Sequence, residues 1–265
     1  MEKYYGVFKD MKDLYQDSIS EHGIYDDIFS TVYTSLMNET NEIRYYVENA
    51  FCVGEKILEV ACGDGSNYMI PLAKKGFSVD GVEISQSMID RFEENTKNLP
   101  ARIRKNMHIM QGDIFEFDTD TLYDLIIIPS TTICLLADDD EKLERLFHKI
   151  SSWLRPGGRF MFDYRVDQML GNQYLSALMS TCNKEKQYFM MMQEFNNFVP
   201  GRAIVNMYVE QMDEGQPKKY IASSEKRIIT DSLINQALSK TDFMDYNTYM
   251  INLPNAEIKL RVLEK

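Results

Sequence analysis

The chain has 265 residues, of which 44% are hydrophobic and 12% aromatic, so it can bury a large core. Its formal net charge of −12 disfavours a nucleic-acid partner, because phosphate contacts require Lys and Arg clustered on one face. A neutral or cationic substrate fits this charge better, although acidity can also serve solubility alone. No apolar run has the length of a membrane span and the first residues include no apolar signal segment, so we expect a cytoplasmic protein without membrane contact.

Metal and disulfide chemistry have little support in the sequence. The four cysteines lack CxxC spacing, and the three histidines, His22, His108 and His148, are far apart. We therefore expect neither a metal site nor a disulfide.

A strand, a glycine loop and a helix follow one another in "KILEVACGDGSNYMIPLAKKG", residues 56–76. The apolar run of residues 57–60 indicates a buried strand, and the apolar residues of 69–73 recur at helical spacing. Gly63 and Gly65 remove two β-carbons at the turn, so a ligand can approach the backbone there. This pattern is typical of a nucleotide-type site.

Strands and helices continue to alternate along the chain. Further strands are predicted in "FSVDGVEIS" (77–85), "NMHIMQGDIFEF" (106–117), "YDLIIIPS" (123–130) and "RFMFDY" (159–164), with a helix from 138 to the Pro-Gly-Gly at 156–158. Five alternations predict an α/β protein with a doubly wound, mostly parallel sheet. Ligands of such sheets bind at the carboxyl ends of the strands, where residues 59–65, 83, 113 and 129–132 are expected to lie.

The alternation is interrupted after Arg165, and we divide the chain into four parts accordingly. Residues 1–50 are expected to form a helical, tyrosine-rich cap, and residues 51–164 the ligand-binding core. Residues 165–229 are expected to begin with a polar helical stretch and to continue as an antiparallel insertion on the substrate side. Residues 230–265 are expected to complete the core with a helix and an edge hairpin.

Four motifs in order resemble those of the class I S-adenosylmethionine (SAM) dependent methyltransferases. They are "EVACGDG" at 59–65, Glu83, Gly112-Asp113 and "RPGG" at 155–158, and the resemblance covers roughly residues 56–164. It implies a Rossmann-like, seven-stranded sheet in the order 3-2-1-4-5-7-6 with helices on both faces. It also implies SAM as the cofactor and S-adenosylhomocysteine as its product. The family often has glycine where Ala61 stands.

The resemblance also implies roles for individual residues. Glu59 would accept from the amino group of the ligand, Glu83 would accept both ribose hydroxyls, and Asp113 would accept from the adenine amino group. The full implied cofactor-binding set is Glu59, Ala61, Cys62, Gly63, Gly65, Glu83, Ile84, Met88, Asp113, Ile114, Ser130, Thr131, Tyr15 and Tyr25. Plainer interpretations stay open: Asp113 as a turn residue, Ser130 to Thr132 as an ordinary polar loop, and Cys62 as a small loop residue.

Two other classes of protein compete with this interpretation. A nicotinamide oxidoreductase would require glycine at Tyr68, where a tyrosine obstructs close helix–strand packing. A non-catalytic SAM-binding or interaction module would leave a complete cofactor cleft with an acidic ribose ligand unexplained. A SAM-dependent methyltransferase is therefore the favoured function.

For the methyl acceptor, we expect the amine nitrogen of a small metabolite or peptide terminus, with a hydroxyl or carboxyl oxygen as the alternative. Of the histidines, only His22 is expected to approach the cleft. Few residues could therefore act as the general base that a hydroxyl acceptor usually requires. Tyr25, Tyr164 and Glu194 are the candidate catalytic residues that accept a proton, and the insertion is expected to govern substrate choice. The protein is expected to be a monomer or homodimer.

Overall fold

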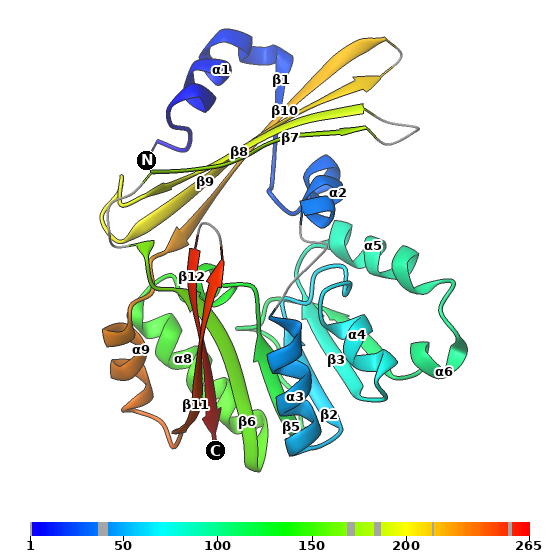
Figure 1. The fold of residues 1–265 in the computed structure, drawn as a ribbon, viewed down its shortest axis with the longest axis vertical. Coiled ribbons are helices and arrows are strands. Elements are labelled where there is room, and N and C mark those ends of the chain that lie inside the picture. The colour runs from blue at the N-terminus through cyan, green and yellow to red at the C-terminus, as the bar shows by residue number, and fades with distance from the viewer. Residues whose placement is uncertain (1, 37–41, 169–172, 183–186, 214, 254–255) are drawn as a thin grey trace. The chain divides into compact units, whose positions relative to one another are not determined.

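The structure, a computed structural model, describes residues 2–36, 42–168, 173–182, 187–213, 215–253 and 256–265. The chain folds into two compact units, each assembled from segments far apart in the sequence (Figure 1). The insertion unit consists of Met1–Leu36 and Gln168–Ile228, and the core unit of Met37–Asp167 and Ile229–Lys265. The first residues of the chain therefore fold together with the segment that follows the fifth strand of the core.

A seven-stranded sheet in the order β4-β3-β2-β5-β6-β12-β11 forms the centre of the core unit. Its strands are β2 (Lys56–Val60), β3 (Ser78–Glu83), β4 (Met107–Gln111), β5 (Tyr123–Ile128), β6 (Leu154–Arg165), β11 (Met244–Leu253) and β12 (Ala256–Glu264). Numbered by their order along the chain, they read 3-2-1-4-5-7-6. The first five strands of this series pair in parallel, whereas β12 is antiparallel to β6 and to β11. The predicted fold class is confirmed.

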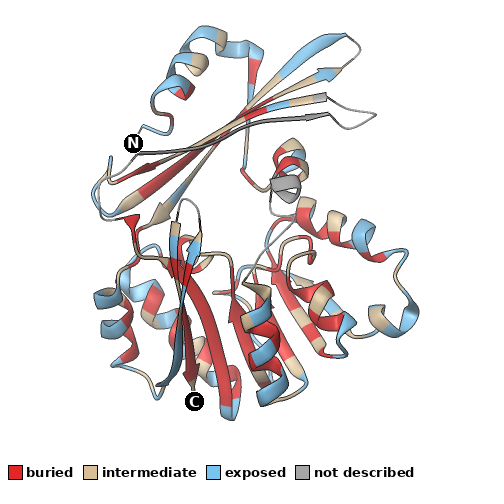
Figure 2. Cartoon of the chain, viewed as in Figure 1, coloured by how far each residue is buried: buried red, intermediate tan, exposed pale blue. Residues whose placement is uncertain are grey.

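Helices cover both faces of this sheet. They are α3 (Ile43–Val53), α4 (Met69–Lys74), α5 (Gln86–Thr96), α6 (Ala101–Arg104), α7 (Ile133–Leu136), α8 (Asp140–Trp153) and α9 (Asp231–Leu238). One hydrophobic cluster joins the sheet to α7, α8 and α9, and a second joins it to α3, α4 and α5. The central strands β2, β3, β5 and β6 are largely buried between the two helical layers (Figure 2). Burial on both faces explains the unbroken apolar run of β5, whose residues Leu125 to Ile128 are fully buried.

The pairing of β2 with β5 positions the site. These strands are parallel neighbours, with Ile57 opposite Leu125 and Glu59 opposite Ile127. Because β3 lies on the other side of β2, the loops that follow all three strands emerge at one edge of the sheet.

The insertion unit contains a five-stranded sheet in the order β1-β10-β9-β8-β7. Its elements are α1 (Val7–Tyr15), the 3₁₀ turn η1 (Gln16–Ser18), β1 (Ile19–His22), α2 (Asp27–Leu36), β7 (Gln173–Cys182), β8 (Gln187–Asn196), β9 (Arg202–Asp213) and β10 (Gln216–Arg227). Strands β7 to β10 form the antiparallel insertion that the sequence predicts.

Two elements of the insertion unit differ from expectation. Strand β7 lies where we expected a polar helical stretch, and it pairs with β8 from Gln173 opposite Phe195 to Cys182 opposite Gln187. Strand β1 interrupts the expected helical cap and pairs in parallel with β10, far away in the sequence. In both cases cross-strand pairing overrides a weak local pattern.

Alternate residues of β9 pack on opposite faces of this second sheet. Ile204 and Tyr208 contact the cluster that contains Phe8 of α1, whereas Val205, Met207 and Val209 join the cluster that contains Phe29 and Val32 of α2. Buried Asn206 accepts a hydrogen bond from the Tyr5 N–H (3.0 Å) and donates one to the Lys3 carbonyl (2.8 Å). These contacts hold the N-terminal segment on the insertion unit.

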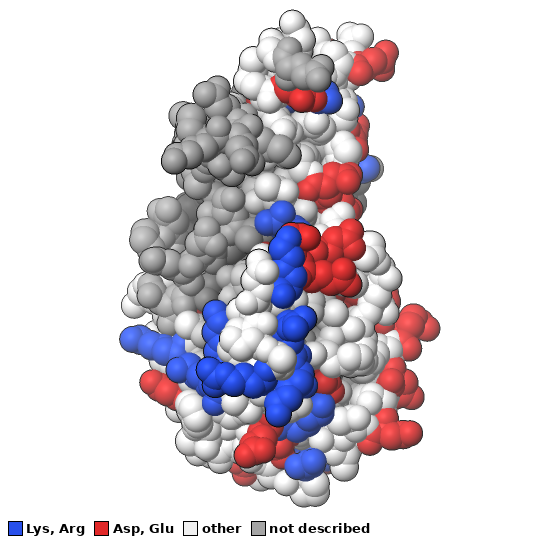
Figure 3. Space-filling model, turned by 90° about the vertical axis from the view of Figure 1, so that its right-hand side faces the viewer, with Lys and Arg blue, Asp and Glu red and all other residues white. Residues whose placement is uncertain are grey.

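The negative charge of the chain is unevenly distributed. Figure 3 shows a face on which Lys and Arg side chains gather in one region and Asp and Glu in others. In the core unit, residues 97–105 carry four exposed cations, Lys97, Arg102, Arg104 and Lys105, and no acidic residue. In the described part of the chain, none of the helices combines the length and the apolar character needed to cross a bilayer.

Candidate functional site

The loop after β2 turns sharply at three left-handed residues. Ala61, Gly63 and Gly65 have φ values of 54°, 56° and 71°. A β-carbon on Gly65 would lie 2.7 Å from the Phe92 ring, so packing requires glycine there. A β-carbon on Gly63 would have no neighbour within 4 Å. The backbone at Gly63 is therefore left open to a ligand, as the sequence predicts for a cofactor loop.

Glu59, at the end of β2, carries a buried oxygen without a partner. The residue is 2% exposed, and its Oε2 has no hydrogen bond. Burial raises the pKa of Glu59 well above its usual range, with further increases from the charges of Glu83 and Asp64 and an opposing effect from the Met69 backbone N–H. An unsatisfied buried carboxylate oxygen is costly, and a cationic amino group would satisfy it. This environment fits the amino end of SAM.

Glu83, at the end of β3, holds the glycine loop. Its Oε2 accepts from the Gly63 N–H and its Oε1 from the Ser85 N–H, both at 2.8 Å. The carboxylate is 6% exposed. Each carboxylate oxygen can accept a further bond, so the predicted ribose contact is compatible with these two. Glu83 thus links the strand ends of β2 and β3.

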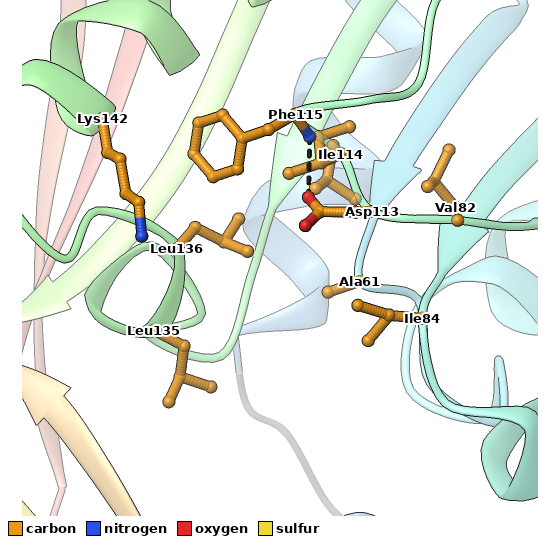
Figure 4. Close-up of a pocket in the computed structure, with 11 residues that line it drawn as sticks. Ala61, Val82, Ile84, Asp113, Ile114, Phe115, Leu135, Leu136 and Lys142 are labelled. Carbon is orange, nitrogen blue, oxygen red and sulfur yellow. Dashed lines mark hydrogen bonds between the residues drawn. The ribbon is translucent and has the colours of Figure 1, made fainter.

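A pocket opens beside these strand ends, and Figure 4 shows most of its lining. The lining consists of Val60, Ala61, Val82, Ile84, Gly112, Asp113, Ile114, Phe115, Leu135, Leu136 and Lys142. Most of these side chains are apolar, and Asp113 supplies a carboxylate, of which Oδ1 accepts from the Phe115 N–H at 2.8 Å. An apolar slot with one carboxylate suits an adenine ring with its exocyclic amino group.

Four predicted site residues line this pocket: Ala61, Ile84, Asp113 and Ile114. Cys62 and Met88 are buried and lie outside the lining. The Cys62 sulfur lies 2.6 Å from where a β-carbon of Gly81 would be, which supports the interpretation of Cys62 as a small packing residue. The Met88 N–H donates to the Ser85 hydroxyl at 3.3 Å, which caps α5.

The turn after β5 is held by an aspartate that the sequence analysis missed. Ser130 and Thr131 have φ values of 60° and 56°. The Ser130 N–H donates to Asp163 Oδ2 at 3.0 Å, and the Thr131 N–H donates to Oδ1. The Tyr46 hydroxyl also donates to Oδ2, at 2.6 Å. Asp163 comes from β6, so only the folded sheet brings these groups together.

Other lining residues also went unpredicted. Leu135 and Leu136 belong to α7, which follows directly after the turn at residues 129–132. The apolar letters "ICLL" after a strand end could have indicated this wall. Phe115 and Lys142 carry no such signal. Lys142 is an exposed residue in the first turn of the amphipathic helix α8, where a lysine is ordinary.

Tyr164 has a poor environment for a proton acceptor. It is fully buried and its hydroxyl donates to Asp231 Oδ1 at 2.6 Å. Burial, together with that hydrogen bond, raises the pKa of Tyr164 above its usual value. A phenol that already donates to a carboxylate does not readily accept a proton, and we do not retain Tyr164 as a candidate base.

The other three predicted residues belong to the insertion unit. Tyr15 ends α1, and the Lys219 ammonium lies 4.8 Å from the centre of its ring. Tyr25 is partly buried against the cluster that contains Phe29. Glu194 of β8 accepts from the Gln168 side-chain amide at 2.7 Å. Their roles toward cofactor or acceptor remain predictions.

Comparisons with known proteins match the region that contains this site. Residues 57–158 match a family model described as a methyltransferase domain. A cypemycin N-terminal methyltransferase from a Streptomyces species is 26% identical over 110 residues, which is 42% of each chain. The first three curated relatives are matched over 42%, 65% and 53% of their own length.

Solved structures share the fold over nearly the whole chain. The sugar N-methyltransferase KedS8 from a Streptoalloteichus species superposes with a TM-score of 0.69 at 17% identity, covering 92% of this chain and 97% of the other. The glycopeptide N-methyltransferase MtfA in complex with SAM gives 0.65 at 17% identity, covering 98% and 97%. Residues 57–158 therefore match a methyltransferase domain, and the fold of the chain is that of known SAM-dependent methyltransferases.

Proposed function

We propose that the protein transfers a methyl group from SAM to an amine nitrogen of a small metabolite or a peptide terminus. The observation that carries the cofactor assignment is the unpartnered oxygen of buried Glu59. It lies at the end of β2, where Glu83 and the open backbone of Gly63 complete the site. The negative charges of Asp64 and Glu83 act on Glu59 there. Such a site favours a cationic ligand.

The residues present would hold the parts of SAM as follows. Glu59 would accept from its amino group, Glu83 from its ribose hydroxyls, and Asp113 from its adenine in the apolar pocket. When bound, SAM supplies an electrophilic methyl group on a sulfonium. The chain itself must orient the acceptor for in-line attack and exclude water, and a neutral amine requires no further activation. The proton that the amine loses can pass to Glu194 or to water, and the Tyr25 hydroxyl can relay it by giving its own proton to water.

Transfer to nitrogen is supported by what the similar proteins are called. The relative from Streptomyces is an N-terminal methyltransferase, and the solved structures act on a glycopeptide and a sugar nitrogen. Because identities are low, these names support the reaction class and leave the acceptor unspecified. Transfer to a hydroxyl or carboxyl oxygen is the alternative.

A panel of matched acceptors tests the proposal. The purified protein is incubated with methyl-labelled SAM and trialanine, N-acetyl-trialanine, glucosamine or glucose, and products are located by mass spectrometry with fragmentation. We expect label on the free amines and none on the two acceptors whose amine is blocked or absent. Methyl groups found only on oxygen, or no methyl transfer to any amine of an extended panel, would contradict it.

A further inference from the structure

A buried carboxylate is attached to the turn that follows β5. Asp163 is 1% exposed and receives three hydrogen bonds, from the Ser130 and Thr131 N–H groups and from the Tyr46 hydroxyl. Two successive backbone N–H groups that converge on one carboxylate resemble the anion-binding concavities formed by left-handed turns. Here the anion belongs to the protein.

The turn adopts a conformation that its residues do not favour. Ser130 and Thr131 are both left-handed, and neither is glycine. Consecutive left-handed residues with side chains persist only where the surroundings impose them, and such strain concentrates at functional sites. The two bonds to Asp163 hold the N–H groups of both residues in this conformation.

The turn lies beside the glycine loop. It follows β5, the parallel neighbour of β2. The Ser130 hydroxyl lies 3.5 Å from the hydroxyl of Tyr68, the residue that precedes α4, and the Tyr68 ring packs edge-on against Tyr46 at 5.0 Å. The contacts of Asp163 therefore reach the loop that would hold the methionine part of the cofactor.

A purely structural role would not require a charge at this position. Burial raises the pKa of Asp163 to about 6 despite the opposing effect of its three donors, and the charge of Glu42 raises it further. The Tyr46 hydroxyl donates to it, and Tyr68 in turn acts on Tyr46. The carboxylate is charged at neutral pH and reduces the stability of the fold there.

We propose that Asp163 is a positioning residue for methyl transfer, which holds the Ser130–Thr131 turn in the shape that the reacting end of the site requires. This inference rests on the proposed function. Asp163 would affect the rate of methyl transfer. Glu59, Glu83 and the pocket would bind the cofactor.

The substitution Asp163→Asn keeps the shape of the side chain and removes its charge. Whichever way the amide is oriented, its NH₂ group faces one of the two turn N–H groups, so one of them loses its acceptor. We expect kcat to fall about ten- to a hundredfold, with the SAM dissociation constant close to wild type and the thermal midpoint at pH 8 no lower than that of wild type. The matched control is Asp124→Asn, since Asp124 accepts from the Lys56 N–H (2.9 Å) at the start of β5. This control should not lower kcat comparably.

The substitution Tyr46→Phe tests the mechanism through pH. It removes one donor from the carboxylate, which favours the protonated form, so the acid-side inflection of kcat should move to higher pH. Its control is Tyr123→Phe, because Tyr123 is also buried and donates to a carboxylate, Asp80 at 2.9 Å, away from the turn. An inflection set by the acceptor amine would not respond to either variant.

An experiment that needs no methyl acceptor tests this inference independently of the proposed function. In protein labelled with ¹⁵N-serine and ¹⁵N-threonine, the Ser130 and Thr131 amide signals should titrate with a midpoint near that of Asp163, and Tyr46→Phe should raise the midpoint. Failure of the wild-type protein to bind SAM would refute the proposed function and would leave the amide titration unaffected. The inference is overturned if Asp163→Asn turns over at the wild-type rate, if its SAM affinity and thermal midpoint fall together with its rate, or if Tyr46→Phe leaves the amide midpoint unchanged.

Discussion

Glu83 combines two roles that a binding measurement alone would confuse. Its two oxygens already accept from the Gly63 and Ser85 N–H groups. Substitution by alanine would therefore release the glycine loop and weaken SAM binding even without a ribose contact. The ribose role must be tested with a change in the ligand as well as in the protein.

We predict that the wild-type protein binds 5′-methylthioadenosine more tightly than its 2′-deoxy analogue. A hydrogen bond to a charged group contributes about 1.5–3 kcal/mol. In Glu83→Gln this preference should shrink, because the amide has one acceptor oxygen where the carboxylate has two. Competition against a fluorescent SAM analogue measures both affinities. An equal preference in the two proteins would show that Glu83 only supports the loop.

Single site residues were predictable where they belong to a local sequence motif. Glu59, Glu83 and Asp113 stand at strand ends next to glycine or a helix start, and the structure places them along one edge of the sheet. Asp163 was not predictable, because its three partners lie 32 to 117 residues away in the sequence. Tyr164, two positions after Phe162 in an apolar strand, looked available in the sequence but is bonded to Asp231.

In the glycine loop, substitutions at Gly65 and at Gly63 should affect stability and ligand binding separately. A β-carbon at Gly65 meets the Phe92 ring, whereas one at Gly63 meets open space. Gly157 offers a control, since it is also left-handed (φ 75°) with no neighbour within 4 Å and lies near the start of β6.

We predict that Gly65→Ala lowers the free energy of unfolding by about 1–3 kcal/mol, because the new methyl group overlaps a packed ring. Gly63→Ala should lower it by only about 1 kcal/mol, the cost of a left-handed alanine, and should weaken SAM binding strongly. Gly157→Ala should lower the free energy of unfolding as much as Gly63→Ala does, and it should leave SAM binding unchanged. Urea unfolding and SAM titration of the three variants check this. Unchanged SAM affinity in Gly63→Ala would contradict a ligand at the open position.

Elements were predictable when their own pattern was strong. The buried strands β2 and β5 and the amphipathic helix α8 appear where the sequence indicates them. Strand β1 has four residues, of which one is buried, and it exists because β10 offers it a partner two hundred residues later. Strand β7 likewise depends on β8. Such pairings are set by tertiary structure, which a local pattern does not contain.

For the whole molecule, the buried acids predict an unusual dependence of stability on pH. The folded-state pKa of Glu59 and of Asp163 is raised, for Asp163 from 3.8 to about 6. Between the unfolded-state and the folded-state pKa values, the folded protein therefore binds more protons than the unfolded chain. The free energy of unfolding falls as pH rises through this range and stays low above it. Glu21, Asp167 and Asp231, whose pKa values are lowered, act at lower pH and in the opposite direction.

We predict that wild-type protein without SAM loses about 1–2 kcal/mol of stability between about pH 5 and about pH 7.5 relative to the double variant Glu59→Gln/Asp163→Asn. Urea unfolding of both proteins across this range measures the difference. A constant difference between them would show that these carboxyl groups have ordinary pKa values in the folded state.

The central claim is that the strand ends of β2 and β3 bind SAM, with the buried Glu59 carboxylate facing its amino group. Calorimetric titration of wild-type and Glu59→Gln protein with SAM and with 5′-methylthioadenosine, which lacks the amino-acid part, tests it most directly. We predict that the wild type prefers SAM. Glu59→Gln should weaken SAM binding by about 1.5–3 kcal/mol and leave the affinity for 5′-methylthioadenosine nearly unchanged. No binding of SAM to the wild type, or equal SAM affinity in the two proteins, would contradict the account.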